Sequence, residues 1–448
     1  MLHIVDTPDS YVQHLVKLSQ RYQVSLSEDV KNQSGAVLVH KGKHLDEELA
    51  QKICSHQLAQ PLENCVKLNA NIDGHTLMEY FQKVFSKHVP LAQFHQKKEL
   101  ASLLESGCEY YQKFPSIVQK ITVLKVQSPA LFHQALMCGY MSLLIGQELQ
   151  LSEQECRWVF LAGLIHNIGI LHLDKNVQAN KGEYTSQQWR TMQSHPILAY
   201  EFLKRVPDLP NGIATAVLEH HECCDGSGYP FNKPGSQLGL MGQIVGMSDT
   251  CLAIYNRELA HKQLGFDALI PLLKLNSSIY NQKVYGVTIA LLQDVNWPLT
   301  RVYPDAQMPD VIKRLLSQQQ IIQHDYRVIY SVLNNIAAHI PDNKKTAMLK
   351  YVSQRVHCFF ERSGILQPAH SEWLSKGMTA PQAADFLAIE KYEITYSEVS
   401  WQLKQLVKLL CWLWDKKHFK HPKLQEMVQK GLSQLRRHHG QKALLQAV

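Results

Sequence analysis

Histidine is the most unusual residue of this sequence, with 23 copies among 448 residues. Several of these histidines lie in the middle of the chain, beside an amide or a carboxylate, at spacings that suggest a site. In chain order the candidate ligands are His166, Asn167, His195, His220, His221 and Asp249. Imidazole nitrogens bind zinc and iron, and carboxylates bridge pairs of ions. Because two such ions can activate a hydroxide and neutralise the oxygens of a phosphate, we predict a metal site for phosphate chemistry.

Several helices must meet to bring these candidates together. Between about residues 100 and 290 the pattern is almost entirely helical, and two capping boxes, Ser152 to Glu155 and Thr185 to Gln188, predict helix starts. His166 ends a helix that reads as buried, and His195-Pro196 is expected inside the helix that Thr185 opens. Further helices are predicted over residues 211–219 and 240–255. A bundle core is the expected place for such a site.

The order and spacing of these groups resemble the HD-GYP family. That family has a histidine on an early helix, then His-Asp-x-Gly-Lys, a His before Pro, His-His-Glu-x-x-Asp-Gly-x-Gly-Tyr-Pro and a final Ala-Asp. This chain has His-Asn-Ile-Gly-Ile from His166, His195-Pro196, His-His-Glu-Cys-Cys-Asp-Gly-Ser-Gly-Tyr-Pro from His220, and Ser-Asp ending at Asp249. The resemblance covers roughly residues 120 to 260. It implies the fold of metal-dependent cyclic di-GMP phosphodiesterases.

The chain departs from the family pattern at several positions. Asn167 replaces the aspartate that bridges both metals, and Ile170 replaces a lysine that faces a substrate phosphate. The early-helix ligand aligns with Gln134, and His133 is one residue away, which turns a helix position by roughly 100°. An alignment slip would restore His133. The usual arginine after the last aspartate aligns with Glu258, beside Arg257.

These departures affect the two metal positions differently. The resemblance assigns the first ion to Gln134, His166, Asn167 and Asp249, which leaves two strong ligands. It assigns the second to Asn167 and to the three imidazoles of His195, His220 and His221. Three histidines with a water fit a mononuclear, zinc-like site. We therefore expect one divalent transition metal ion (Fe, Mn or Zn) or none.

Two hypotheses of function follow, and the sequence leaves open whether the protein is an enzyme. The first is a degenerate HD-GYP domain in cyclic di-GMP signalling, acting as a binding or protein-interaction module with weak or no hydrolysis. The alternative is an active metal-dependent phosphohydrolase, such as a cyclic di-GMP phosphodiesterase. Asn167 and Ile170 favour the first hypothesis, because an active two-metal enzyme should not tolerate both.

The Gly-Tyr-Pro segment matches the family at every defining position, in contrast to the metal ligands. Its residues are Gly226, Gly228, Tyr229 and Pro230. In the family this exposed loop has been linked to diguanylate cyclase (GGDEF) domains, so the expected partners are such domains or cyclic di-GMP. The alternative is a tight structural turn with glycines at positive φ. Glu222 and Asp225 are expected to orient His220 or His221.

The fold class predicted for the whole chain is mainly α. We expect a small N-terminal α+β module over residues 1–100, an HD-GYP-like bundle over 101–290 and a helical C-terminal domain over 291–448. Residues 36–39 read as a strand and residues 45–53 as a helix.

Composition restricts the remaining possibilities. No apolar run is long enough for a membrane span. No signal peptide is recognisable, so we expect the protein to lie in the cytoplasm and its ten cysteines to be reduced thiols. The net charge of +7 fits an anionic small molecule or a protein partner. Nucleic acid is disfavoured, because the basic stretch at residues 416–423 lacks interleaved stacking aromatics.

Overall fold

A computed structural model describes residues 10–20, 22–69, 71–178, 184–298, 300–339, 344–379, 383–415 and 422–439. The chain forms two compact units. The first unit comprises residues 1–253 and 278–296, and the second comprises residues 254–277 and 297–448. The predicted N-terminal module and HD-GYP-like bundle therefore lie in one unit. The borders that the sequence predicts at residues 100 and 290 stay predictions.

The N-terminal module mixes helices with short strands, as predicted. Its elements are α1 (Ser10–Ser19), β1 (Val24–Leu26), β2 (Val30–Lys31), β3 (Val37–Val39), α2 (Glu47–Cys54), a 3-10 turn (Leu62–Cys65) and β4 (Val66–Leu68). β1 pairs antiparallel with β4, and β2 pairs antiparallel with β3. The predicted strand at residues 36–39 is β3. The predicted helix is α2, and the Asp46 carboxylate caps it by accepting a hydrogen bond from the amide of Leu49.

Helices make up the rest of the first unit, beginning before the predicted residue 100. They are α3 (Gly74–Lys87), α4 (Val89–Lys97), α5 (Ala101–Tyr111), α6 (Pro115–Gln127), α7 (Pro129–Glu148), α8 (Glu153–Ile165), a 3-10 turn η2 (Ile168–His172), α9 (Lys175–Gln178), α10 (Ser186–Met192), α11 (His195–Leu203), α12 (Asn211–Glu219), α13 (Leu240–Ile254) and α15 (Gln282–Asp294). Both capping boxes form as predicted, at Ser152 and Thr185. The mainly α fold is confirmed.

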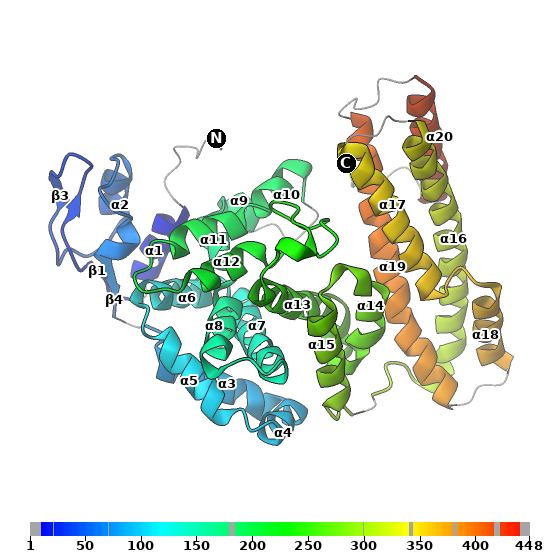
Figure 1. Ribbon diagram of the computed structural model, residues 1–448, viewed down its shortest axis with the longest axis horizontal. Helices are drawn as coiled ribbons and strands as arrows, with labels where there is room; N and C mark the ends of the chain where they lie inside the picture. The colour runs from blue at the N-terminus through cyan, green and yellow to red at the C-terminus, as the bar shows by residue number, and fades with distance from the viewer. Residues whose placement is uncertain are drawn as a thin grey trace. The chain divides into compact units, whose positions relative to one another are not determined.

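α7 and α8 lie side by side at the centre of this unit (Figure 1). Gly163 of α8 permits their close approach: a Cβ there would lie 2.7 Å from Ser142 Oγ and 2.8 Å from the Cys138 carbonyl of α7. Side chains on neighbouring turns of the two helices are almost all buried. This contact places the C-terminal end of α8, where His166 follows, against the buried face of α7.

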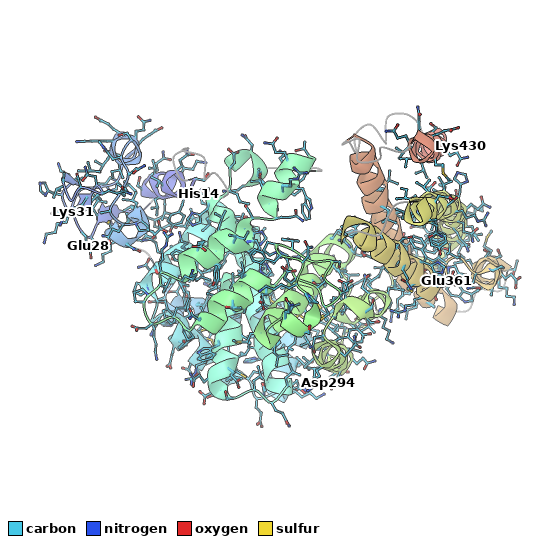
Figure 2. All side chains as sticks on the ribbon, turned by 45° about the horizontal axis from the view of Figure 1, so that its top comes forward. His14, Glu28, Lys31, Asp294, Glu361 and Lys430 are labelled. Atoms are coloured by element: carbon cyan, nitrogen blue, oxygen red, sulfur yellow. The ribbon has the colours of Figure 1, made fainter. Side chains whose placement is uncertain are left out.

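α15 belongs to the first unit, although residues 254–277, which precede it, belong to the second unit. Its last residue, Asp294, is labelled in Figure 2. The Asp294 carboxylate accepts hydrogen bonds from the ammonium groups of Lys97 and Lys98, which lie at the end of α4. These ion pairs tie residues 278–296 to the N-terminal half of the unit.

The second unit is a separate helical bundle. Its principal elements are a π-helical turn (Tyr255–Leu259), α14 (Ile270–Leu275), α16 (Met308–His339), α17 (Lys344–Ser363), α18 (Pro368–Thr379), α19 (Ala383–Asp415) and α20 (Pro422–His439). Its core is apolar and centres on α16 and α19. The predicted helical C-terminal extension is confirmed. Part of the basic stretch, residues 416–421, lies outside the described residues.

Buried carboxylates of α19 are paired with cations inside this second unit. Glu390 accepts a hydrogen bond from Arg301 at 2.8 Å, and Glu398 pairs with Arg257. The Arg257 guanidinium also lies 4.6 Å from the ring centroid of Trp401. Arg257 is therefore committed to contacts of the second unit. Among the helices that the structure describes, none combines the length and the apolar content needed to cross a bilayer.

Candidate metal centre

Three histidines of the first unit are oriented by the same local device. In each, ring atom Nδ1 contacts the backbone carbonyl three residues earlier, which places the Nδ1 proton on that hydrogen bond. The pairs are His166 with Gly163 at 2.7 Å, His195 with Met192 at 2.8 Å, and His220 with Val217 at 2.6 Å. Nε2 is left to face the interior. Metal-binding histidines are commonly held in this way, by a hydrogen bond from the nitrogen that does not bind the metal.

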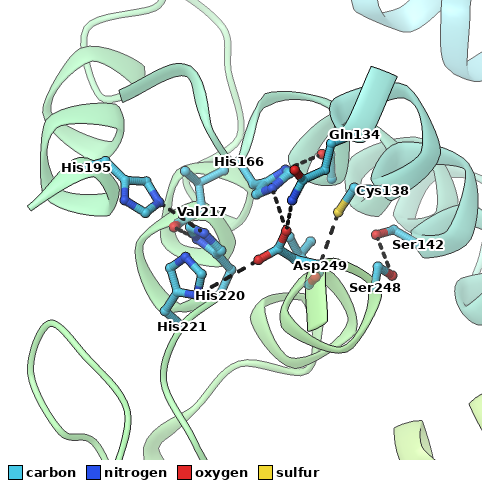
Figure 3. Close-up of polar contacts among 12 residues, drawn as sticks. Gln134, Cys138, Ser142, His166, His195, Val217, His220, His221, Ser248 and Asp249 are labelled. Carbon is cyan, nitrogen blue, oxygen red and sulfur yellow. Dashed lines mark hydrogen bonds and ion pairs between the residues drawn. The ribbon is translucent and has the colours of Figure 1, made fainter. Parts of the chain in front are cut away.

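His195, His220 and His221 converge on one point (Figure 3). Their candidate ligand atoms all lie within 4.8 Å of one another, and the Nε2 atoms of His195 and His220 are 3.4 Å apart. This proximity confirms the predicted convergence of these histidines. His195 begins α11 instead of lying inside the preceding helix, because Pro196 has no amide proton and suits a first helical turn.

The donor set of these three histidines fits a transition metal ion. With their Nδ1 protons engaged, His195 and His220 present two unprotonated nitrogens to each other, and neither can donate to the other. Two nitrogens bound at about 2.05 Å to one tetrahedral ion would be about 3.3 Å apart, close to the spacing here. Burial also lowers the pKa of His195 to about 4 and that of His220 well below its usual range. Both imidazoles are therefore neutral, the form that binds metal.

A second possible ligand group adjoins the first and shares His220 with it. It consists of His166, His220 and Asp249. His166 is fully buried, and its Nε2 lies 3.2 Å from Asp249 Oδ1. Burial opposes charge on both groups, but Cys138 and Asp249 together raise the pKa of His166, and His166 lowers the pKa of Asp249. The contact between His166 and Asp249 thus favours an ion pair.

Gln134 completes this second group from α7. Its side-chain amide donates a 2.7 Å hydrogen bond to Asp249 Oδ1, the oxygen that also faces His166 (Figure 3). Asp249 Oδ2 instead faces His221, with 4.0 Å between the oxygen and Nδ1. His133 is exposed. The position predicted for the early-helix ligand is thus occupied by Gln134, and the alternative register with His133 is wrong.

The two substituted positions of the His-Asp-x-Gly-Lys motif are both buried. Asn167 follows His166, and its carbonyl oxygen accepts a hydrogen bond from the Ile170 amide at the start of η2. Ile170 packs in an apolar cluster with Leu173 and Val177. A side chain at this position is therefore surrounded by hydrocarbon, which matches isoleucine and disfavours a cation.

The Gly-Tyr-Pro segment packs against the histidines, contrary to the expectation of an exposed loop. Gly226 has a φ of 75°, as the turn interpretation predicts. Gly228 is buried, and a Cβ there would lie 2.4 Å from the His221 carbonyl oxygen. The ring of Tyr229 is half-buried and stacks on His221 with 4.6 Å between centroids. Tyr229 thus supports His221, a candidate metal ligand. The peptide bond between Tyr229 and Pro230 is cis.

Glu222 and Asp225 hold this loop and do not contact the histidines through the hydrogen bonds described. The Glu222 carboxylate accepts from the amides of Phe231 at 2.6 Å and Lys233 at 3.0 Å. Asp225 accepts from the amide and the hydroxyl of Ser227. Adjacent loop amides therefore engage both carboxylates, and the expectation that they orient His220 or His221 stays a prediction.

Comparison with known proteins agrees with this geometry. A family model described as "HD domain" matches residues 119–265. The cyclic di-GMP phosphodiesterase response regulator RpfG of Xanthomonas campestris is 29% identical over 28% of this chain and 34% of its own length. A 3'3'-cGAMP-specific phosphodiesterase 3 of Vibrio cholerae is 29% identical over 24% of this chain and 23% of its own length. A cyclic di-GMP phosphodiesterase of Thermotoga maritima is 30% identical over 27% of this chain and 33% of its own length.

These matches show an HD domain in residues 119–265 and, with the ordered histidine motifs, support the resemblance to the HD-GYP family. The HD domain of this chain is similar to those of cyclic dinucleotide phosphodiesterases. The matched segments span between 23% and 34% of these three relatives.

Proposed function

We propose that the HD domain of this protein is degenerate: it binds one divalent transition metal ion and acts in cyclic dinucleotide signalling with weak or no hydrolysis. His195, His220 and His221 would hold the ion, with iron, manganese or zinc as candidates. The ligand class is proposed from relatives that are named as cyclic di-GMP and 3'3'-cGAMP phosphodiesterases. The cytoplasm, predicted from the sequence, is the proposed location.

The observation that carries this proposal is the state of Asp249. Its Oδ1 accepts a hydrogen bond from Gln134 and pairs with His166, so protein groups already satisfy that oxygen. Asn167, which replaces the family's bridging aspartate, adds no charge. A two-metal site needs anionic ligands that ions can share. The half of the site with three neutral imidazoles has no such defect.

Each side chain then has a defined task. A bound ion would supply positive charge for phosphate oxygens. The carbonyls of Met192 and Val217 hold the imidazoles of His195 and His220 in the tautomer that leaves Nε2 free. The Tyr229 ring holds His221 by stacking. Because Ile170 lies in hydrocarbon, no cation at that position assists a phosphate.

An active phosphohydrolase is the second candidate. Three imidazoles that leave a fourth position open to water are also the ligand pattern of mononuclear catalytic zinc sites. The adjacent pair of His166 and Asp249 could hold a proton near such a water. This candidate ranks second because both the bridging carboxylate and the phosphate-facing cation are missing.

Elemental analysis, calorimetric binding and hydrolysis assays on one preparation of the full chain separate the candidates. We expect one ion per chain, binding of cyclic di-GMP or 3'3'-cGAMP, and hydrolysis at least a hundredfold below that of an intact family enzyme, since one lost electrostatic group typically costs that much. Two ions per chain would contradict the degenerate site. Rapid hydrolysis that His220→Ala abolishes would make the protein an enzyme.

A diguanylate cyclase (GGDEF) domain is the proposed protein partner, through the loop that follows Tyr229. Because Tyr229 packs on His221, its removal would disturb the histidines as well as any interface. Phe231 is the better probe, as 54% of it is exposed. We expect Phe231→Ala to weaken capture of such a domain in a pull-down while metal content stays constant. Equal capture by the variant would contradict a role for this loop.

A further inference from the structure

A series of aromatic rings leads from the histidines to the surface of the first unit. The Tyr229 ring, which stacks on His221, is met edge-on by Trp189, with 6.1 Å between centroids and 72° between ring planes. Trp189 is 45% exposed, and Tyr184 lies on it with 6.3 Å between centroids. The indole is thus within two ring contacts of a candidate metal ligand and open to solvent.

The exposed indole is held in place by its surroundings. Trp189 lies in α10, whose start is fixed by the capping box of Thr185 and Gln188. The Trp189 amide donates to the Thr185 carbonyl at 2.8 Å. Tyr184 packs against the apolar cluster that contains Ile170. A large aromatic surface fixed in this way loses little conformational entropy when a ligand covers it.

A nucleobase is the occupant that this surface fits. Every base has a π face that stacks on an indole without a specific hydrogen-bond pattern. If the phosphate of a ligand lies at the three imidazoles, its base extends away from them. The series of rings from His221 through Tyr229 to Trp189 leads in an outward direction, so the base can reach the indole. The hydrocarbon around Ile170 means that residue 170 supplies no cation to a ligand, so apolar contact is the contribution that this cluster offers.

We propose that Trp189 is the stacking platform for one purine base of a cyclic dinucleotide whose phosphates face His195, His220 and His221. This assignment rests on the proposed function and names a ligand-binding residue for it. Trp189 does not contact the candidate ion's ligands directly, so its loss leaves metal binding intact.

Calorimetric titration of the metal-loaded full chain with cyclic di-GMP tests the assignment. The variants are Trp189→Ala, Trp189→Leu and Trp189→Phe, where leucine keeps apolar bulk and phenylalanine keeps a ring. Trp401→Ala is the matched control, because Trp401 is a similarly exposed tryptophan (38%) of the second unit. We expect the alanine and leucine variants to raise Kd roughly tenfold to a hundredfold and phenylalanine less than about fivefold. The control should bind like wild type, and every variant should retain the metal content of wild type.

The possible results separate this assignment from the function on which it rests. Wild-type affinity in Trp189→Ala and Trp189→Leu would overturn the stacking role and leave the proposed function standing. Equal weakening by leucine and phenylalanine would also overturn it, because a stacking site must prefer the ring. Absence of binding of both cyclic di-GMP and 3'3'-cGAMP by the wild type would overturn both.

Discussion

The histidine cluster has two halves that share His220: one consists of His195, His220 and His221, and the other of His166, His220 and Asp249. Backbone carbonyls orient histidines in both halves, yet the two halves differ in their chemistry. In one half, His195, His220 and His221 bring neutral imidazole nitrogens together, and nothing among the described contacts satisfies them all. In the other, Gln134 and His166 satisfy the Oδ1 atom of the Asp249 carboxylate. Ligand-type residues are thus not enough to define a metal site. What their lone pairs already contact decides whether an ion is needed.

Removing one ligand from each half gives the largest expected contrast. We expect His195→Ala to lose the bound ion, because two imidazoles hold a transition metal far more weakly than three, while His166→Ala keeps it. His220→Ala, which is common to both groups, should lose the ion in either case. Elemental analysis after dialysis measures the result. Retention of metal by His195→Ala with loss by His166→Ala would exchange the roles of the two halves.

Restoring the second half should produce a second ion. In the double variant Gln134→His with Asn167→Asp, a neutral donor and an anionic bridge replace two amides, so we expect metal content to rise from one ion to two per chain. Adding Ile170→Lys tests whether hydrolysis of cyclic di-GMP then increases, although the apolar surroundings of residue 170 oppose a charge. A double variant that is folded and still holds one ion would show that the amides are not the obstacle.

Gln134 also permits a stability test with a neighbour as control. Gln134→Ala removes a hydrogen bond to the Asp249 carboxylate, which typically costs about 1.5–3 kcal/mol. His133→Ala, at the exposed adjacent position, should change the free energy of unfolding by less than about 0.5 kcal/mol. The comparison is made by urea unfolding of the protein after a chelator has removed the metal. Similar losses in both variants would mean that Gln134 does not support Asp249.

The two halves should respond to pH with opposite sign in the metal-free protein. The pKa of His195, lowered to about 4 by burial, means that the unfolded chain binds a proton that the folded chain does not, so stability falls between pH 6.5 and 4. From pH 7 to pH 5 this histidine alone predicts a loss of about 2 kcal/mol. The raised pKa of His166 works the other way: its contribution is complete below the usual histidine pKa and disappears as pH rises through the raised value.

Single variants separate these contributions in urea unfolding at several pH values. His195→Gln should flatten the acid side of the stability profile, and His166→Gln should flatten the alkaline side. An unchanged acid slope in His195→Gln would assign that slope to other groups.

Local patterns predicted much of this protein. The capping boxes at Ser152 and Thr185, helix α12 at residues 211–219 and strand β3 depend on interactions within a few residues, which the sequence contains completely. The ordered motifs from His166 to Asp249 also indicated correctly that these histidines converge. The departures from the family pattern at Asn167 and Ile170 could also be recognised, because the residue type at a position is part of the sequence itself.

Only the tertiary structure decided contacts between distant segments. Gln134 and Asp249 are 115 residues apart, and their hydrogen bond settled which residue of α7 faces the site. The packing of Tyr229 on His221 reversed the expectation of an exposed loop, and its contact with Trp189 had no signal in local spacing. Sequence by itself determined which residue types were present and in which helices. Which lone pairs and ring faces stayed open depended on how those helices packed, because each contact joins residues far apart along the chain.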